Sequence, residues 1–591
     1  MTAPDHRTEP PRPPAAVRLS SVLSSVLPAA RRRVAAVFSS QPSQPAAPFA
    51  GWGFLWRPAL IGLLALVAIG VGSSFSNSPF KLENPGAWFF GVPTKPVPPL
   101  APVNSATMLL GITLVYGGLV LLLRVWIQLA GIARRHPGAP LGRLGWLLAL
   151  WILPMLVVAP LFSRDVYSYA AQGEMMTRHM NPYHYGPFDL GSTPYSNAVD
   201  KLWGRVPAPY GPLFLSVDGW IVQLTHHSQL WSIVGLRLLE VGAVVLLAVS
   251  VPVLARGLGF DPGHAFVLCV LNPLVVLTVV GGAHNDGLMA ALLVAGLALA
   301  VKKHPVWGIV VCALAASIKA PAALGIVYIA WEWLGPNLPV RLRLRPLAVA
   351  GLLTAGVLGA CTYVSGLGDG WVKNLNTPGA VRSWAAPATG LGMGLAAIGR
   401  GLGIDVSTTW AISLTRFLGL AIAGVLIVWL LFNADRIGWL KALGYSLLAL
   451  VLLGPVVQPW YLTWGLLLLA IVATEGRLRA WVIGFSVVSP FVGLPGGHKL
   501  LTAIIHAPMI ETGVVLFLLW CVLFAPLGAW TVDAHTPLAA TPRPEGGAGS
   551  LPGGRSEQPL ELDHVEPPSV LAADLALHAD ELEATRGVQA D

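Results

Sequence analysis

Long apolar runs alternate with short polar or basic segments over most of the chain. Between residues 53 and 530, many of these runs reach the roughly twenty residues that a helix needs to cross a bilayer. The runs are continuous rather than alternating with period two, which predicts helices and not the strands of a membrane barrel. We therefore expect an all-α polytopic membrane protein with about fourteen transmembrane helices.

Basic residues recur in the short connections between the apolar runs. Positive charge in short loops favours the cytoplasmic side, so these residues predict an orientation. With the N-terminus inside, helices at about 57–75, 106–129 and 144–162 cross in turn, and the loop that follows lies outside. The basic positions are residues 31–33, Arg134, Arg135, Arg143, Arg256, Lys302, Lys303, Arg341, Arg343, Arg345, Arg436, Lys441, Arg477 and Arg479.

The alternation of sides restricts the segment that follows the first outer loop. Ser163 is expected outside and Arg256 inside, so an odd number of crossings separates them. The long run at 230–254 supplies one crossing. The shorter run at 210–225 is therefore expected to be an interfacial or re-entrant helix on the outer face.

A second apolar stretch, at 306–335, is expected to cross twice although it is short for two spans. Its halves must then meet inside the membrane at residues 319–321. Proline favours a break there, and broken helices are tolerated in membranes where they line a wet cavity. The same reasoning places 282–286, 367–408, 455–460 and 494–506 on the outer side.

The two ends of the chain differ in composition from the apolar region. Residues 1–52 are rich in Pro, Ala, Ser and Arg and lack a cleavable signal pattern, whereas residues 531–591 are Pro- and Gly-rich and then acidic. We expect two disordered cytoplasmic tails around one transmembrane domain at 53–530. The outer loop at 163–229 is part of that domain.

Composition excludes several other classes of protein. The chain is 55% hydrophobic and 11% charged, whereas a soluble protein is about 25% charged. Its net charge of +9 lies largely in the short loops, so it does not indicate nucleic-acid binding. The four cysteines fall inside apolar runs without the spacing of a metal site, and we interpret them as small buried hydrophobic residues.

The outer loop begins with the most unusual polar residue, Asp165. A carboxylate at the mouth of a membrane helix is costly to place near hydrocarbon, which makes it a candidate functional group. Arginines and tyrosines surround it in the sequence, a mixture that suits a site for a sugar and a phosphate. If such a site transfers a sugar, the candidates in this loop are Arg164 for the phosphate-linked sugar donor and Tyr167, Tyr183 and Tyr210 for the sugar acceptor.

Further polar clusters are predicted on the same outer face. The triplet of His284, Asn285 and Asp286 has the chemistry to bind a sugar or phosphate, to cap the next helix, or to bind a metal. Lys319, at the predicted break, needs a counter-charge, which a lipid phosphate or an internal carboxylate would supply. Arg237 and Glu240 share a helix face and are expected to form a structural ion pair. The remaining donor-site candidates are Arg382, Gln458, Tyr461 and Lys499.

The motifs DVYSYAAQGEMMTRHMNPYHYGP, PAPYGPLFL, GGAHNDGLM, SIKAP and QPWYLTW occur in this order along the chain. As a set they resemble the actinobacterial polyprenyl-phosphate-mannose-dependent α-1,6-mannosyltransferases, which have the GT-C membrane fold. The resemblance covers about residues 55–530. It implies a general base in an early outer loop, which maps to Asp165; Glu83, in the first outer loop, is the rival.

This resemblance implies an inverting transfer of mannose from polyprenyl-phosphate-mannose to a growing lipomannan-type acceptor, such as a mannosylated phosphatidylinositol. One carboxylate suffices for inversion, and no metal or other cofactor is expected. The reaction would occur at the extracytoplasmic face of the plasma membrane. The main alternative is a transporter or flippase of lipid-linked sugars, and a weaker one is a scaffold of a cell-envelope complex.

Overall fold

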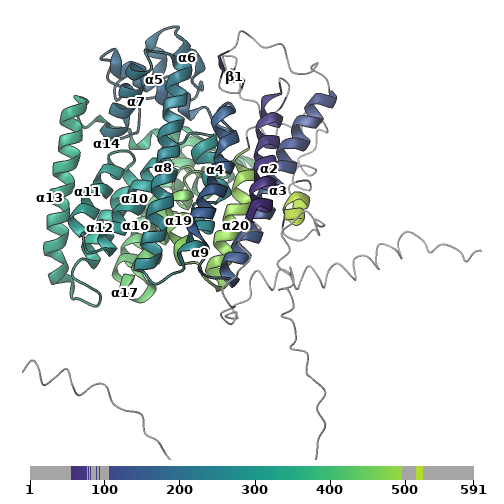
Figure 1. Ribbon diagram of the computed structural model, residues 1–591. Helices are drawn as coiled ribbons and strands as arrows, with labels where there is room; N and C mark the ends of the chain where they lie inside the picture. The colour runs from purple at the N-terminus through teal and green to yellow at the C-terminus, as the bar shows by residue number, and fades with distance from the viewer. Residues whose placement is uncertain are drawn as a thin grey trace, which may run out of the picture. The chain divides into compact units, whose positions relative to one another are not determined.

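The computed structural model describes residues 55–75, 78, 80, 88–89, 92–93, 105–494, 514 and 516–522. Both predicted tails, Glu83 and Lys499 lie outside these residues, so the predicted domain boundaries stay predictions. The described part is helical except for one antiparallel pair, β1 (Trp88–Phe89) with β2 (Val92–Pro93). Figure 1 shows most of the long helices side by side. The predicted all-α fold class is confirmed.

The first three predicted helices are present as α2 (Trp56–Ser74), α3 (Ser105–Arg135) and α4 (Leu141–Val157). Glycine allows α2 and α3 to approach closely, because a Cβ at Gly118 would meet the Ala65 carbonyl oxygen at 2.6 Å. Small residues at such contacts are typical of membrane helices, where close van der Waals packing holds helices together.

The outer loop folds into a small helical unit. It contains α5 (Asp165–Thr177), η2 (Pro187–Leu190), α6 (Pro194–Ala198) and α7 (Pro212–Leu224). In Figure 1, α5, α6 and α7 lie together at one end of the described helices. The run predicted to be interfacial or re-entrant is thus the short helix α7; its position relative to a membrane stays a prediction.

The next helices include one break that the sequence did not predict. They are α8 (Gln229–Gly257), α9 (Pro262–Cys269), the π-helix η3 (Val275–Gly281) and α10 (Asp286–Val301). The apolar run at 268–283 is therefore not one continuous helix. The Asn272 side chain takes over turn hydrogen bonds, accepting from the Leu274 amide at 3.0 Å, and Pro273 follows it without an amide hydrogen.

The predicted break at residues 319–321 is confirmed. Helix α11 (Pro305–Ala316) ends there, a short turn η4 (Ala320–Ala322) follows, and α12 (Ala323–Glu332) begins. The break leaves two backbone carbonyls free, and α7 supplies their donors. The Gly211 amide donates to Ile318 at 3.0 Å and the Leu213 amide donates to Ser317 at 3.2 Å.

The C-terminal half continues with more helices. Figure 1 shows α13 at one flank of the described helices and α20 near α2 and α3. The elements are α13 (Val340–Ser365), α14 (Gly370–Lys373), η5 (Asn374–Ala380), α15 (Pro387–Gly401), α16 (Thr408–Phe432), α17 (Ala434–Ile437), α18 (Trp439–Leu452), α19 (Thr463–Val472) and α20 (Gly476–Val492).

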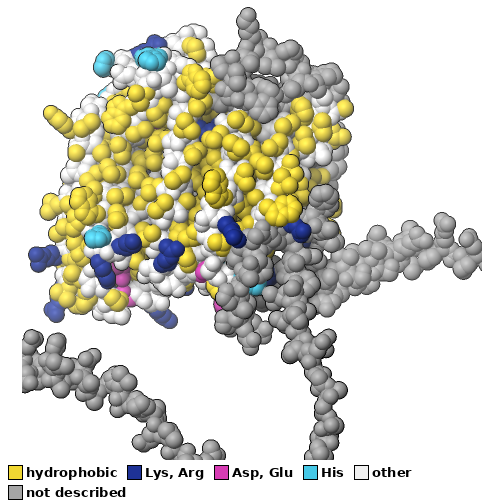
Figure 2. Space-filling view, viewed as in Figure 1, with side chains coloured by type: hydrophobic (Ala, Val, Ile, Leu, Met, Phe, Trp, Pro, Cys, Tyr) yellow, Lys and Arg dark blue, Asp and Glu magenta, His cyan; other side chains and the backbone are white. Residues whose placement is uncertain are grey.

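Basic helix ends gather on the side away from the outer loop. Arg343, near the start of α13, forms an ion pair with Asp435 of α17 at 2.8 Å. Arg479, near the start of α20, donates to the Ala130 carbonyl near the end of α3 at 3.2 Å. Figure 2 shows hydrophobic side chains across the middle of the visible face and Lys and Arg side chains along its lower edge.

In the described residues, five helices are long and apolar enough to cross a membrane, or six if η3 and α10, which are bent by 116°, form one span. Shorter apolar helices, including α4, α7, α11, α18 and α19, lie among them. These features agree with a polytopic membrane protein. The predicted number of about fourteen crossings stays a prediction.

Candidate active site

The structure brings Asp165 and His284 together from distant parts of the chain. Asp165 is the first residue of α5, and its amide donates to the Ser163 hydroxyl at 3.1 Å. Its Oδ2 lies 3.7 Å from Nε2 of His284. The Asp165 side chain is 19% exposed and the His284 side chain 1%. The carboxylate is therefore the accessible member of the pair.

The orientation of the His284 ring is determined by two neighbours. Nδ1 lies 2.7 Å from the Thr278 carbonyl oxygen, which only accepts, so Nδ1 carries a proton. The Trp460 ring stacks on the imidazole with centroids 3.8 Å apart. Nε2 faces Asp165 and has no hydrogen-bond partner among the described residues.

The environment of Asp165 favours proton uptake. Burial raises the pKa of this carboxyl above its usual value, and the nearby His284 and Lys319 partly oppose the shift. A carboxylate with a raised pKa is a stronger base than a solvated one. The position of Asp165 outside the long apolar helices, with part of its side chain exposed, allows a substrate hydroxyl to reach it.

Lys319 has its counter-charge inside the protein. Its Nζ lies 2.8 Å from Oδ1 of Asp286, and the same oxygen accepts from the Trp464 indole at 2.6 Å. The sequence favoured a lipid phosphate as the partner of Lys319 and kept an internal ion pair as the alternative. The alternative is the arrangement in the structure, because α10 starts beside the break between α11 and α12.

Aromatic rings surround the Lys319 ammonium. It lies 4.5 Å from the ring centroid of Tyr461, 5.5 Å from Trp464 and 5.7 Å from Tyr210. Such contacts stabilise a cation that is removed from water. Tyr169 packs edge-on against Tyr210 with centroids 5.3 Å apart, which completes this wall.

The triplet retains polar atoms that the protein does not use. Asn285 Nδ2 and Asp286 Oδ2 are buried without a partner among the described residues, as is His284 Nε2. Buried polar atoms normally have partners, so such atoms indicate water or a ligand. Neither Asn285 nor Asp286 makes the side-chain cap that the sequence left open, since α10 has no side-chain cap at Asn285.

A glutamate from α8 supports the start of α10 instead. Glu240 Oε2 accepts from the Leu288 amide at 3.0 Å. Arg237 donates to backbone carbonyls, including that of Gly281 at 3.2 Å. The predicted Arg237–Glu240 ion pair was wrong, because each side chain reaches towards a neighbouring helix rather than along α8.

Three predicted residues of the outer loop make contacts inside the protein. Arg164 Nε donates to the Ala198 carbonyl at 2.9 Å, which attaches α6 to the start of α5. Tyr183 donates to the Tyr210 carbonyl at 3.0 Å. Tyr167 is 4% exposed within the hydrophobic core. These contacts fold the loop and leave these side chains with internal partners.

The remaining donor-site candidates are more scattered. Arg382 is exposed and donates to the Thr409 hydroxyl at 3.1 Å. Gln458 is half-buried in the connection between α18 and α19, just before Trp460. Lys499 is not among the described residues. The described residues contain no group of three or more His, Cys, Asp or Glu side chains that could hold a metal ion.

Sequence reasoning missed two aromatic members of the site. Trp464 donates to Asp286, and Tyr169 donates to Asn285 Oδ1 at 3.5 Å. Aromatic residues near helix ends are usually interface anchors, so the sequence alone did not distinguish these two. The close spacing of Tyr461 and Trp464 was the available signal, and in the structure their rings stack with centroids 4.7 Å apart.

The chain matches two family models and several known proteins over most of its length. A family model described as "Alpha-(1->6)-mannopyranosyltransferase, N-terminal domain" matches residues 59–335, and an "MptB C-terminal domain" model matches residues 388–532. An alpha-(1->6)-mannopyranosyltransferase of Mycobacterium tuberculosis is 30% identical over 83% of this chain and 93% of its own. The alpha-(1->6)-mannopyranosyltransferase B of Corynebacterium glutamicum is 29% identical over 74% of this chain and 76% of its own. No solved structure is significantly similar to the chain.

Proposed function

The chain belongs to the alpha-(1->6)-mannopyranosyltransferase family, and we propose that it transfers mannose from a polyprenyl-phosphate-mannose donor to a lipid-anchored mannan. Membership of the family supports mannosyl transfer. The donor, the acceptor and the stereochemical course are our proposal. The observation that carries it is the partly exposed Asp165 carboxylate beside His284.

In this proposal Asp165 is the general base. It removes the proton from the 6-hydroxyl of an acceptor mannose, whose oxygen attacks the anomeric carbon of a β-linked mannosyl phosphate. The new C–O bond forms as the bond to the phosphate oxygen breaks, which gives an α linkage and free polyprenyl phosphate. The His284 ring, fixed by Thr278 and Trp460, lines the approach to Asp165 and restricts how the hydroxyl can reach the carboxylate.

The second carboxyl of the site supports a single-displacement mechanism. A retaining enzyme needs a second carboxylate that is free to attack the anomeric carbon. Asp286 is fully buried and bound to Lys319 and Trp464 through Oδ1. It is thus placed to position groups rather than to act as a nucleophile. Asn285, Gln458 and Tyr461 are proposed to orient sugar hydroxyls.

We propose that the reaction occurs outside the cytoplasm, at the plasma membrane. The support is the separation of the basic helix ends, where Arg343 and Arg479 lie, from the helices α5 and α7 beside the site. Positive charge in short loops is typical of the cytoplasmic side. The acceptor would then be a lipoglycan exposed on the opposite side.

The test of this mechanism replaces Asp165 by Asn in the full-length protein purified in detergent. Loss of a general base is expected to lower kcat by at least about 100-fold. The matched control is Asp369→Asn, an exposed aspartate that makes no side-chain cap. Near-normal mannose transfer by a folded Asp165→Asn protein would contradict the assignment, and transfer in detergent by wild type would argue against a transporter.

The pH dependence gives a second measurement on the same residue. Because burial raises the pKa of Asp165, the carboxylate forms only above the usual range for aspartate. We expect kcat/KM to rise with pH through this pKa and then to level off. The stability of the folded protein should fall as the pH rises up to this pKa, because the folded protein binds the proton more tightly than the unfolded chain does. Both effects should be absent in Asp165→Asn.

A further inference from the structure

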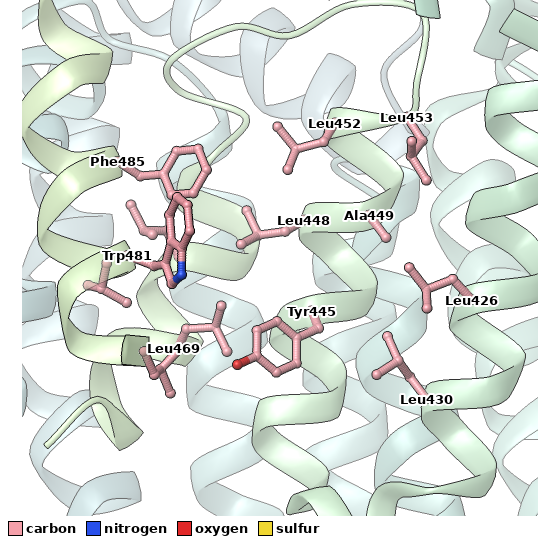
Figure 3. A pocket seen from close by; sticks show the side chains of 13 residues that line it. Leu426, Leu430, Tyr445, Leu448, Ala449, Leu452, Leu453, Leu469, Trp481 and Phe485 are labelled. Carbon is pink, nitrogen blue, oxygen red and sulfur yellow. The ribbon is translucent and has the colours of Figure 1, made fainter. Parts of the chain in front are cut away.

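A hollow with apolar walls lies between α16, α18, α19 and α20. Its volume is about 430 Å³, within the size range of small-molecule sites. Figure 3 shows side chains such as Leu426, Leu448 and Phe485 pointing into it from different helices. We call this hollow the apolar groove. Nothing in the mechanism above uses it.

The apolar groove opens to the surface of the described helices. Trp481 at one side is 65% exposed, and Tyr445 is 37% exposed. Helix α16, which forms one wall, is among the helices long and apolar enough to span a membrane. The opening therefore faces the region where lipid chains would lie, so an occupant could enter sideways from the bilayer.

One face of α16 links the groove to a cation. Arg416, Gly419, Ala423, Leu426 and Leu430 follow each other at spacings of three and four residues, so they share a helix face. The last two line the groove. Arg416 stands ten residues before Leu426, which is about 15 Å along the helix. The face thus carries a guanidinium at one end and apolar side chains at the other.

Among the residues with a described structure, the Arg416 guanidinium has hydrogen-bond acceptors but no carboxylate partner. It donates to the carbonyls of Gly379 and Val381 and to the Thr389 hydroxyl, at 2.6–2.8 Å. Arg382 lies close enough to act on it electrostatically and brings a second positive charge to this place. Neither arginine forms an ion pair in the part of the chain that the structure describes. A cation within a membrane helix normally has a counter-charge.

A short connection joins this cation to the candidate active site. The Thr389 hydroxyl, which accepts from Arg416, donates to the Pro455 carbonyl at 2.6 Å. Pro455 follows Leu453 at the end of the groove, and the same connection continues to Trp460 against His284. Residues 453–460 therefore connect the groove, the hydrogen-bond partner of Arg416 and the ring that stacks on His284.

The charge of the active site makes this cation important. A departing polyprenyl phosphate needs positive charge nearby. Lys319 is neutralised by Asp286, and Asp165 adds a further carboxyl, so these groups offer no net positive charge. Arg416 and Arg382 supply it beyond the groove, about 15 Å from Leu426 along α16. A ligand with an anionic head and a long apolar tail complements this face of α16 in charge and shape.

We propose that the apolar groove holds the polyprenyl chain of the lipid donor and that Arg416, with Arg382, binds its phosphate. This inference rests on the proposed function, because it names the place of that donor. Hydrocarbon gains little by moving from lipid to protein, since lipid tails are as apolar as leucine. The groove therefore orients the chain, and the two arginines determine the charge of the ligand.

The first experiment needs no catalysis. Full-length protein in nanodiscs is irradiated with a polyprenyl phosphate that carries a diazirine in its chain and no sugar, and labelled peptides are identified by mass spectrometry. We expect label on α18 and α20, competed by unlabelled polyprenyl phosphate but not by phosphatidylglycerol. Equal competition by phosphatidylglycerol, or label confined to other helices, would overturn the proposal.

Two variants separate the chain site from the phosphate site. Ala449→Phe fills the groove and should raise the KM of a long-chain donor at least about fivefold, while a donor of two isoprene units is used as by wild type. Its control is Val428→Phe, on the exposed face of α16, which should change neither value. Equal effects of Ala449→Phe on both donors, or no effect on the long one, would contradict the groove assignment.

Arg416→Gln should lower labelling by polyprenyl phosphate at least about fivefold and leave labelling by the uncharged polyprenol unchanged. Equal loss with both probes would reduce Arg416 to a structural role. The two proposals fail separately. Groove labelling in a wild-type protein that transfers no mannose would refute the proposed function alone, and mannose transfer without groove labelling would refute the groove alone.

Discussion

At the scale of single residues, the Lys319–Asp286 pair determines what the site can do. A buried ion pair is weak support for stability, but an unpaired buried charge is costly. The Lys319 side chain is 12% exposed, and the Asp286 side chain is fully buried. The pair therefore positions α10 against the break between α11 and α12, and with it His284 against Asp165.

A double-mutant cycle tests this role. Lys319→Met and Asp286→Asn should each destabilise the protein by about 3–5 kcal/mol, because each leaves one buried group unpaired. The double variant should recover much of that loss. Thermal unfolding midpoints in one detergent are compared across the four proteins. Additive losses, together with a raised donor KM in Lys319→Met alone, would instead indicate that Lys319 meets the donor phosphate.

At the scale of elements, the packing of α7 on the broken helix connects the outer loop to the site. Gly211 lies against the Ser317 carbonyl, where a Cβ would overlap the backbone. The amides of Gly211 and Leu213 occupy the carbonyls that the break leaves free. Such pairing is needed in a membrane, since an unpaired backbone group costs several kcal/mol in hydrocarbon.

Gly211→Ala is expected to separate α7 from the break. The loss of two backbone hydrogen bonds should cost at least about 1–3 kcal/mol and expose the outer loop to limited proteolysis. Gly351→Ala, in an exposed part of α13 with nothing near its Cβ position, is the matched control and should be neutral or slightly stabilising. A Gly211→Ala protein as stable and protease-resistant as the control would show that this contact is not important.

At the scale of the whole molecule, charge and topology predict opposite sides for the outer loop and the basic helix ends. Lys201 is an exposed residue of the outer loop, and Lys302 is exposed at the end of α10. They report on the two sides independently of catalysis. Their side chains are suitable for replacement, since no hydrogen bond or ion pair of the described residues uses them.

We expect a membrane-impermeant maleimide to label Lys201→Cys in intact cells and Lys302→Cys only after permeabilisation. The physical reason is the preference of short basic loops for the cytoplasm. The four native cysteines are first replaced, since Cys361 and Cys521 are half-exposed. Labelling of both positions from outside, or the reverse order, would refute the proposed orientation of the site.

The amino-acid sequence alone was enough to identify the class of the protein and its most unusual residues. Apolar runs of membrane length predict helices because lipid leaves no other way to pair the backbone. Asp165, the His284 triplet and Lys319 are conspicuous because polar groups are rare and costly near hydrocarbon. The break at residues 319–321 was also predictable from the sequence, because proline cannot continue the hydrogen bonds of a helix.

Which of these groups meet depends on how the helices pack. Asp165 lies beside His284, and Lys319 pairs with Asp286, through contacts between segments that are far apart in the chain. Helix periodicity defines the faces of one helix but not their partners, so the sequence left Lys319 between a lipid phosphate and an internal carboxylate. For the same reason it overlooked Trp464 and Arg416, whose importance comes from what surrounds them.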